Sequence, residues 1–353
     1  MINGKNDVHI VYASDDRFAE ILGVSLVSLF ENNKSIASIQ VYILDSNISM
    51  NSKNAIEDVF KQYHRKLPIW ISARNIQKEL QMEIHIDRGS LSQYARLFIS
   101  SLLPDYLERV LYLDCDTIIN QCIGELWEID LQGNIIAALM DAFSKYYRMN
   151  IGLQPNDIMF NSGVILIDLK KWKEKNIEEK LLHFIVSRNG IIQQGDQGAL
   201  NAILSKEVYC FEARFNSVTI FYDFSYKELM TYRKPPCFYS AGEVEIAKRE
   251  PVIIHYTTSF LSRRPWVKNC KHMYVDEWIR YREKSPWREK PFWNSPYLSK
   301  KKAFCIWIAL HLPRTLMIHI SSFFQVMGRP LLTKYRIYKS ISIVQKQKKR
   351  GKK

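Results

Sequence analysis

The sequence predicts an α/β domain with a mostly parallel central sheet, followed by a basic helical tail. Apolar runs of strand character alternate with helical patterns, as in parallel sheets with right-handed crossovers. The 353 residues, 47% of them hydrophobic, suffice for one large domain or two ordinary ones. Residues 290–353 hold 15 Lys and Arg and no Asp or Glu, whereas the rest holds 35 basic and 36 acidic residues. The neutral body argues against nucleic-acid binding, and the tail indicates an anionic surface as its partner.

The first part of the chain alternates strands with helices. The expected elements are strands over 8–13, 39–44 and 67–71 and helices over 18–30 and 52–63. Ser14 or Asp15 would cap the first helix. No Gly-x-Gly-x-x-Gly follows the first strand, so the dinucleotide-binding fingerprint is absent. A carboxylate at that strand end is instead suited to hydrogen-bonding a base or a ribose.

The run 109–118 is predicted to be a buried strand, and it contains two carboxylates separated by one residue. Side chains alternate along a strand, so Asp114 and Asp116 would point the same way and share one hard cation. Open α/β sheets bind ligands at the carboxyl ends of their strands. A lone Asp-x-Asp pair is otherwise a capping or turn feature, and the context decides between the two.

Two further strands are expected to carry polar residues at their ends. One covers 135–140 and leads into Asp141, and the other covers 160–168 and is led by a polar turn at Asn161. A helix over 177–187 follows. Both strands add carboxylate or amide groups to the ligand-binding edge that the aspartates define.

Three isolated residues remain ambiguous from spacing alone. Arg96 lies in an apolar helix expected over 90–104, where it is either paired and buried or extended along the surface. Asp196 is either the N-cap of the next helix or a residue that also faces a ligand. His255 ends an apolar strand over 251–256 and is structural unless the fold brings it beside the aspartates.

We divide the chain into a body, 1–285, and a tail, 286–353. The tail contains an almost wholly apolar run, 303–312, which is too short to span a bilayer, and a second one, 316–327. Basic residues flank these runs, as in helices that lie in a membrane interface, and 346–353 would then be held near anionic lipid. The alternative is an added helical cap with a solvated basic end.

The six cysteines show no Cys-x-x-Cys pair and no zinc-ligand spacing. A polar N-terminal segment runs directly into the first strand, which is not the pattern of a signal peptide. Together these features favour a reducing, cytoplasmic environment.

In their order and spacing, these motifs resemble glycosyltransferase family 8, which includes bacterial lipooligosaccharide and lipopolysaccharide galactosyl- and glucosyltransferases, and glycogenin. The resemblance runs through residues 8 to about 280. It implies a GT-A-type, single nucleotide-binding domain with a mixed, mostly parallel sheet. The matching segments are Ile10–Asp16, Tyr94–Leu97, Leu111–Asp116, Phe160–Val164, Asp196–Gln197, Arg214–Asn216, His255–Tyr256 and Pro265–Trp266.

The resemblance also implies roles for particular residues. Asp114, Asp116 and His255 would bind Mn2+ or Mg2+, which bridges the two phosphates of a UDP-sugar. Asp15 and the backbone near Ala13 would hold the uridine. The other donor contacts would come from Arg96, Asp141, Asn161, Asp196 and Arg264, the last in place of a lysine. Gln197 would sit beneath the anomeric carbon, where it either forms a covalent adduct or steadies an oxocarbenium-like state.

The sequence therefore predicts a metal-dependent, retaining transferase that moves glucose or galactose from UDP-glucose or UDP-galactose. The acceptor would be a lipopolysaccharide core or a lipid-linked surface oligosaccharide, and the enzyme would be peripheral on the inner face of the plasma membrane. The alternative is a non-catalytic nucleotide-sugar-binding or membrane-binding module of the same fold. An RNA-binding protein is disfavoured because the tail lacks a folded stacking platform.

Overall fold

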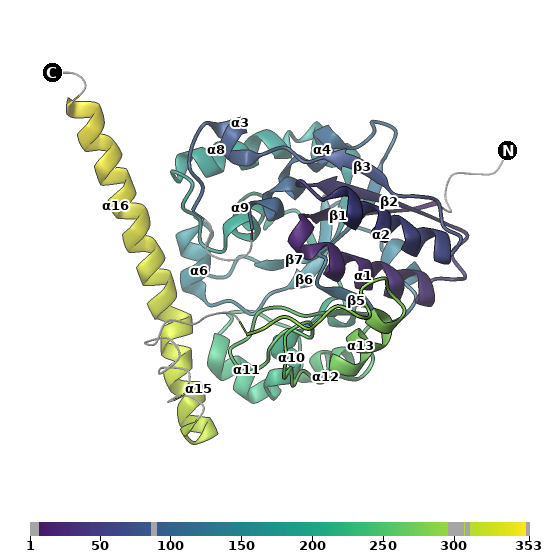
Figure 1. Cartoon of the computed structure of the whole chain (residues 1–353). Coiled ribbons are helices and arrows are strands. Elements are labelled where there is room, and N and C mark those ends of the chain that lie inside the picture. Colours follow the sequence, from purple (N-terminus) through teal and green to yellow (C-terminus); the bar gives the residue numbers. More distant parts are fainter. Residues whose placement is uncertain (1–6, 86–89, 296–306, 308–310, 351–353) are drawn as a thin grey trace.

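A seven-stranded sheet with strand order β3-β2-β1-β4-β7-β6-β8 forms the centre of the structure (Figure 1). This computed structural model describes residues 7–85, 90–295, 307 and 311–350, the last ten of them by backbone alone. The strands of the sheet are β1 Asp7–Ser14, β2 Ser38–Asp45, β3 Ile69–Ser72, β4 Arg109–Leu113, β6 Ile136–Met140, β7 Phe160–Asp168 and β8 Val208–Cys210.

Most neighbouring strands of the sheet are parallel. Only β7 runs against its neighbours, β4 and β6, whereas the β1–β2, β2–β3, β1–β4 and β6–β8 pairs are parallel. The prediction of a mixed, mostly parallel sheet is therefore confirmed. Alternation along β1 sends Ile10 and Tyr12 into one buried cluster and Val11 into a second. Because both faces of the sheet are apolar, both are covered by other elements.

Helices on the two faces complete these clusters. One face is covered by η1 Asp16–Phe18, α1 Ala19–Asn32, α2 Met50–Gln62 and α5 Gly124–Trp127. The other is covered by α3 Ile76–Leu80, η2 Leu91–Phe98, α4 Ile99–Leu102, α6 Lys145–Asn150, α7 Leu169–Glu174, α8 Ile177–Ser187 and α9 Gly195–Leu204. The predicted cap at the first helix is Asp15, whose side chain accepts a hydrogen bond from the Phe18 amide.

The predicted strand over 109–118 is two strands. β4 ends at Leu113, and after a turn at 114–116 the chain continues as β5 Thr117–Ile119. β5 leaves the central sheet and pairs antiparallel with β10 Ile253–His255, which also pairs with β9 Ser217–Val218. The aspartates therefore lie in a turn between two sheets, not on an extended segment, and the pairing of Thr117 with His255 brings the histidine to that turn.

Two other sequence-based expectations need correction. The helix expected over 90–104 begins as a 3-10 helix, η2, and becomes α-helical only in the short α4. The polar residues around Asn161 do not form a turn before the strand but lie within β7. There the register against β6 shifts between Ala138 and Leu139, so 162–164 have no partner on β6. Such a bulge turns the backbone of β7 toward the neighbouring aspartates.

The remaining elements lie below the sheet in Figure 1 and along its side. They are η3 Ala213–Asn216, α10 Thr219–Asp223, α11 Tyr226–Arg233, α12 Ala241–Arg249, α13 Val275–Glu283, α15 Arg314–Phe323, the π-helix η4 Phe324–Gly328 and α16 Arg329–Arg350. The last three form a column that packs on α6 and α11. This confirms a helical C-terminal region.

The tail is described in part. The apolar run predicted over 303–312 lies mostly outside the described residues, and so do the side chains of 346–353. Among the residues that the structure does describe, no helix is long and apolar enough to cross a bilayer.

Candidate active site

The turn after β4 and the end of β10 place two carboxylates and an imidazole together. His255 Nε2 lies 3.3 Å from Asp116 Oδ1 and 3.8 Å from Asp114 Oδ2. One ligand atom from each of the three residues lies within 4.8 Å of the others. The predicted trio thus forms one group of potential metal ligands.

Two arginines leave each aspartate with one oxygen facing the histidine. Arg96 Nη2 contacts Asp114 Oδ1 at 2.6 Å, and Arg264 Nη2 contacts Asp116 Oδ2 at 3.2 Å. The oxygens that remain are the two that face His255 Nε2. The arginines balance the charge of the carboxylates and fix their orientation, because each ion pair restrains one side of a carboxylate plane.

This donor set fits a divalent cation such as Mn2+ or Mg2+. Carboxylate oxygens suit these ions, and an imidazole nitrogen is also an accepted ligand. The fit depends on Gly163 of β7, where an added Cβ would lie 2.1 Å from His255 Cε1 and 2.8 Å from Asp114 Oδ2. The strand thus leaves room for both ligands where any side chain would exclude them. The sequence placed Gly163 in the motif but gave it no role.

The environment shifts two carboxyl pKa values in opposite directions. Burial raises the pKa of Asp116, but Arg264 and His255 more than offset it and lower that pKa to about 2. Burial is also the largest influence on Asp196, and it raises the pKa of this carboxyl to about 6 despite the nearby Arg96. Asp116 is therefore a carboxylate at neutral pH, whereas Asp196 takes up a proton under mildly acidic conditions.

Arg96 connects the metal-ligand group to α9. Its side chain is buried, with 7% of its area exposed, and its Nε lies 3.1 Å from Asp196 Oδ2. Of the two possibilities for Arg96, the paired and buried one is confirmed. Asp196 is not the N-cap of α9, because the helix starts at Gly195 after Gln194 and Asp196 lies in its first turn. Gln194 and Gly195 both have positive φ, and this left-handed entry turns Asp196 toward Arg96.

A second group of polar side chains lies beside this one. Asp141 Oδ2, after β6, accepts hydrogen bonds from Gln197 Nε2 at 3.2 Å and from Asn161 Nδ2 at 3.4 Å. Gln197 Oε1 accepts one from the Ser162 amide at 3.2 Å. Ser162 in turn accepts at its carbonyl from Arg96 Nη1 at 2.6 Å. The residues expected on the sugar side are thus one network, joined to the metal-ligand group through Ser162.

Ala13 and Asp15 lie at the carboxyl end of β1, which pairs with β4. The Ala13 carbonyl accepts a hydrogen bond from Cys115 Sγ at 3.3 Å. Asp15 Oδ2 accepts one from Ser92 Oγ at 3.3 Å. No hydrogen bond or ion pair among the described residues joins Asp15 to the metal-ligand group directly, but the two strand ends are neighbours.

Sequence reasoning missed three contributors to the site. Ser162 links Arg96 to Gln197, and the Tyr112 hydroxyl donates to Asp114 Oδ1 at 3.0 Å. Asn216 Oδ1 lies 3.0 Å from His255 Nδ1. All three lie inside matched motifs, so a signal existed, but the partners of Asn216 and Ser162 come from distant parts of the chain.

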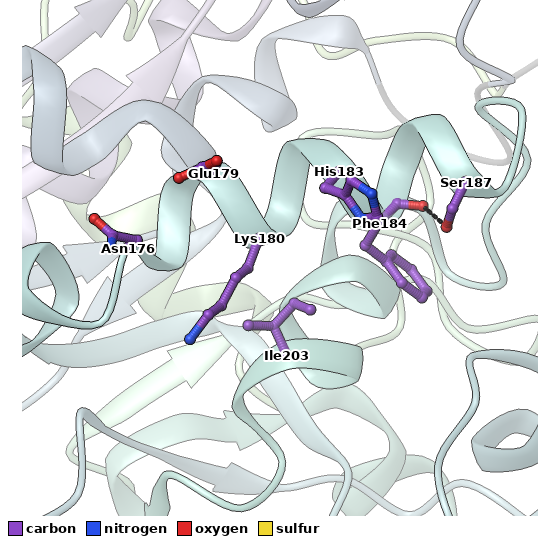
Figure 2. Close-up of a pocket in the computed structure, with 7 residues that line it drawn as sticks. All are labelled: Asn176, Glu179, Lys180, His183, Phe184, Ser187 and Ile203. Atoms are coloured by element: carbon purple, nitrogen blue, oxygen red, sulfur yellow. Dashed lines mark hydrogen bonds between the residues drawn. The ribbon is translucent and has the colours of Figure 1, made fainter.

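Figure 2 shows the residues that line a hollow elsewhere, along α8 and beside Ile203 of α9. Its volume is about 430 Å³. Its lining residues are Asn176, Glu179, Lys180, His183, Phe184, Ser187 and Ile203. The Ser187 hydroxyl donates to the Phe184 carbonyl at 2.7 Å, an internal bond of the helix. None of these residues belongs to the two groups above, so we place the candidate site at the aspartates.

The model of Glycosyl transferase family 8 matches residues 9–270. The chain is therefore a glycosyltransferase and belongs to this family. The family that the sequence motifs resemble is therefore confirmed.

Two bacterial proteins are similar to this chain over most of their length. General stress protein A from Bacillus subtilis (strain 168) is 27% identical over 283 residues, 79% of this chain and 94% of that protein. Lipopolysaccharide 1,2-glucosyltransferase from Escherichia coli (strain K12) is 26% identical over 292 residues, 82% of this chain and 81% of that protein.

A solved structure shares the fold. The galactosyltransferase LgtC, in complex with donor and acceptor sugar analogues, matches with a TM-score of 0.66 and 24% identity over 80% of this chain and 100% of that one. The GT-A-type architecture expected from the sequence is therefore confirmed.

Proposed function

We propose that this glycosyltransferase uses UDP-glucose or UDP-galactose as donor, requires Mn2+ or Mg2+, and retains the anomeric configuration of the hexose. The observation that carries the proposal is the trio of Asp114, Asp116 and His255, in which each carboxylate keeps one oxygen directed at the imidazole. A divalent cation held there would neutralise the charge that develops on the departing diphosphate.

The chain's own residues supply the rest of the proposed chemistry. Arg264, with 29% of its side chain exposed, lies at the edge of the trio and would meet a phosphate oxygen. Asp196 and Asp141 would stabilise positive charge on the sugar. The Gln197 amide is held at both ends, by Asp141 and by Ser162, so it would present a fixed carbonyl dipole beneath the anomeric carbon.

For the acceptor, we propose a lipopolysaccharide core or a lipid-linked surface oligosaccharide, reached from the inner membrane face. The similar Escherichia coli protein is named as a lipopolysaccharide glucosyltransferase. On α16 the buried Ile337 faces the body, whereas Leu331, Leu332, Tyr335 and Tyr338 are more than half exposed. Exposed aliphatic and aromatic side chains beside Lys334 and Arg336 are typical of a helix in a membrane interface.

The decisive experiment measures turnover of the two UDP-sugars by the purified chain, with Mn2+ and with EDTA. We expect UDP release with one of them, at least about 100-fold faster with metal, and NMR of the glycosylated product should show a retained anomeric configuration. Full activity in EDTA would exclude the proposed metal site. Nucleotide-sugar binding without turnover, with any acceptor fraction, would favour the non-catalytic module.

A first prediction tests whether turnover depends on the trio. Asp114→Asn should lower the turnover with Mn2+ by about 100-fold or more, because it weakens the charge available to the cation. Asp105→Asn is the matched control, since Asp105 is fully exposed and, among the described residues, its one ion pair is with Lys173. Comparable activity of the two variants, at equal folded fraction by circular dichroism, would contradict the assignment.

A further inference from the structure

A chain of buried hydrogen bonds runs from the metal-ligand group to the sugar-side group, and its direction is fixed at one point. The backbone amide of Gly163 donates to Asn161 Oδ1 at 3.0 Å. An amide N–H is only a donor, so this atom of Asn161 is the oxygen. The other end of the Asn161 side chain is then the NH2 group, which donates to Asp141 Oδ2.

The same oxygen fixes Asn216, which is completely buried. Asn216 Nδ2 donates to Asn161 Oδ1 at 3.0 Å, so the opposite atom of the Asn216 amide is its oxygen. That oxygen lies 3.0 Å from His255 Nδ1. Because a carbonyl oxygen accepts only, His255 Nδ1 must carry a proton and donate it. A backbone amide thus determines, through two asparagines, which nitrogen of His255 is protonated.

The ring of His255 has no freedom to turn away from this arrangement. Its side chain is 4% exposed, and its Cε1 lies against the backbone of Gly163 so closely that a Cβ could not be added there. With Nδ1 directed at Asn216, Nε2 is the nitrogen that faces Asp114 Oδ2 and Asp116 Oδ1. The lone pair for a cation must therefore come from Nε2.

We infer that Asn216 is a positioning residue, which holds His255 in the Nδ1-protonated form and thereby sets the affinity of the trio for a divalent cation. The same side chain links that affinity to Asn161 and Asp141. The inference rests on the proposed function, since it presumes that the trio binds Mn2+ or Mg2+. It assigns a role to the end of the Arg214–Asn216 motif, which no part of the proposed chemistry uses.

Two substitutions separate the two hydrogen bonds of Asn216. Asn216→Leu keeps the branched shape of the side chain and can neither accept from His255 nor donate to Asn161. Asn216→Asp keeps an acceptor for His255 Nδ1 but loses the donor to Asn161. We expect the leucine variant to bind Mn2+ about 10- to 100-fold more weakly, as for other residues that orient a metal-bound histidine. The aspartate variant should stay within about threefold of the wild type, because a carboxylate also orients a ligating histidine.

The readout is Mn2+ binding followed by the EPR signal of the free ion, without substrate, so it does not depend on turnover. In parallel, 15N NMR of the metal-free protein with neutral imidazoles should show His255 protonated at Nδ1 in the wild type and in Asn216→Asp, but no longer fixed there in Asn216→Leu. The control is Asn33→Leu, which removes an equally buried asparagine that bonds to Leu29 and Ile123.

The possible outcomes distinguish a failure of the proposed metal site from a failure of the role of Asn216. A wild-type chain that binds no Mn2+ would overturn the proposed metal site. A wild type that binds Mn2+ while Asn216→Leu binds it equally well would overturn the role of Asn216 alone. Equal losses in the leucine and aspartate variants would also overturn it, since packing rather than the bond to Nδ1 would then be responsible. Should Asn216→Leu fail to fold, the protonation state of His255 in the metal-free wild type decides, because a proton on Nε2 would overturn the role of Asn216.

Discussion

At the scale of single residues, the two oxygens of each carboxylate in the trio have different partners. Each aspartate of the trio gives one oxygen to an arginine and directs the other at His255. Such pairing makes buried charge tolerable, because an isolated carboxylate in this position would carry a large desolvation cost. A substitution that displaces one of these side chains is therefore expected to displace its partners as well.

Gly163 gives the sharpest steric prediction. Gly163→Ala should displace His255 or Asp114 and reduce turnover by about 100-fold, since a shift of about 1 Å has that effect at a reacting site. Mn2+ affinity should fall with it. Gly242→Ala in α12 is the control, because the nearest atom to its added Cβ is 4.0 Å away. A Gly163→Ala variant with normal Mn2+ affinity would show that the strand does not shape the site.

Asp196 gives a prediction in pH. Its pKa rises from 3.8 to about 6 on folding, so the folded state binds the proton more tightly than the unfolded one. This group therefore favours folding at low pH, and the contribution is lost as the pH rises through about 6. Asp196→Asn cannot titrate. Relative to the wild type, its free energy of unfolding should increase by roughly 2.4 kcal/mol between about pH 4 and pH 7.

Urea unfolding of both proteins at several pH values measures this difference. Asp105→Asn serves as the control with the opposite sign, since Lys173 lowers the pKa of the exposed Asp105. A stability difference for Asp196→Asn that stays constant with pH would mean that Arg96 compensates fully for the burial of the carboxyl.

At the scale of elements, the site lies where ends of separate segments meet. The turn between β4 and β5 supplies the aspartates, β10 the histidine, β7 the glycine and Asn161, and α9 the Asp196–Gln197 pair. The C-terminal helices approach the same region. Asn150 at the end of α6 donates to the Pro330 carbonyl of α16 at 2.7 Å and to Gln193 Oε1, just before α9, at 3.0 Å.

Through these two hydrogen bonds, Asn150 connects α16 to the residues that precede α9. Asn150→Ala leaves the Pro330 carbonyl and the buried Gln193 amide without this donor, which should weaken the docking of α16 by about 1–3 kcal/mol. Amide hydrogen exchange in 329–340 should accelerate accordingly. Asn134→Ala, which removes only a bond within its own loop, should leave that exchange unchanged. Equal exchange in both variants would mean that Asn150 does not hold α16 in place.

At the scale of the whole molecule, charge and apolar surface gather at one end of the chain. A nearly neutral body carries the site, while residues 290–353 of the tail hold 15 basic residues and no acidic ones. The tail is nevertheless attached to the body: Arg314 of α15 contacts both oxygens of Glu228, at 2.6 and 2.8 Å. Membrane contact through the tail would therefore place the body at a defined distance from lipid-linked acceptors.

The membrane proposal predicts a dependence on both lipid charge and salt. The full chain should sediment with phosphatidylglycerol vesicles, less so with rising ionic strength, and hardly with neutral vesicles. The double variant Lys334→Gln, Arg336→Gln should bind about 30-fold more weakly, at about 1 kcal/mol for each charge. Lys34→Gln with Lys61→Gln, two exposed lysines of the body, is the matched control. Salt-independent binding to neutral vesicles would contradict this picture.

Much of the fold could be predicted because its elements have clear local patterns. The strands around Ile10, Val41 and Leu111 are apolar and short, and the helices between them are amphipathic or buried. The turn at Asp114–Asp116 was mistaken for an extended strand, since apolar residues continue on both sides of it. The N-cap considered for Asp196 is wrong for a related reason, because a polar residue near a helix start satisfies the capping pattern whatever its partner is.

By itself, the sequence determined the family, the mostly parallel sheet and the residue types that could meet a cation and a sugar, because periodicity and motif order are local or one-dimensional properties. Only the tertiary structure decided that His255 faces the aspartates, that Arg96 is buried between Asp114 and Asp196, and that a backbone amide fixes the hydrogen bonds of two asparagines. These are contacts between distant segments, and they exist only once β5 has paired with β10 and β4 with β7.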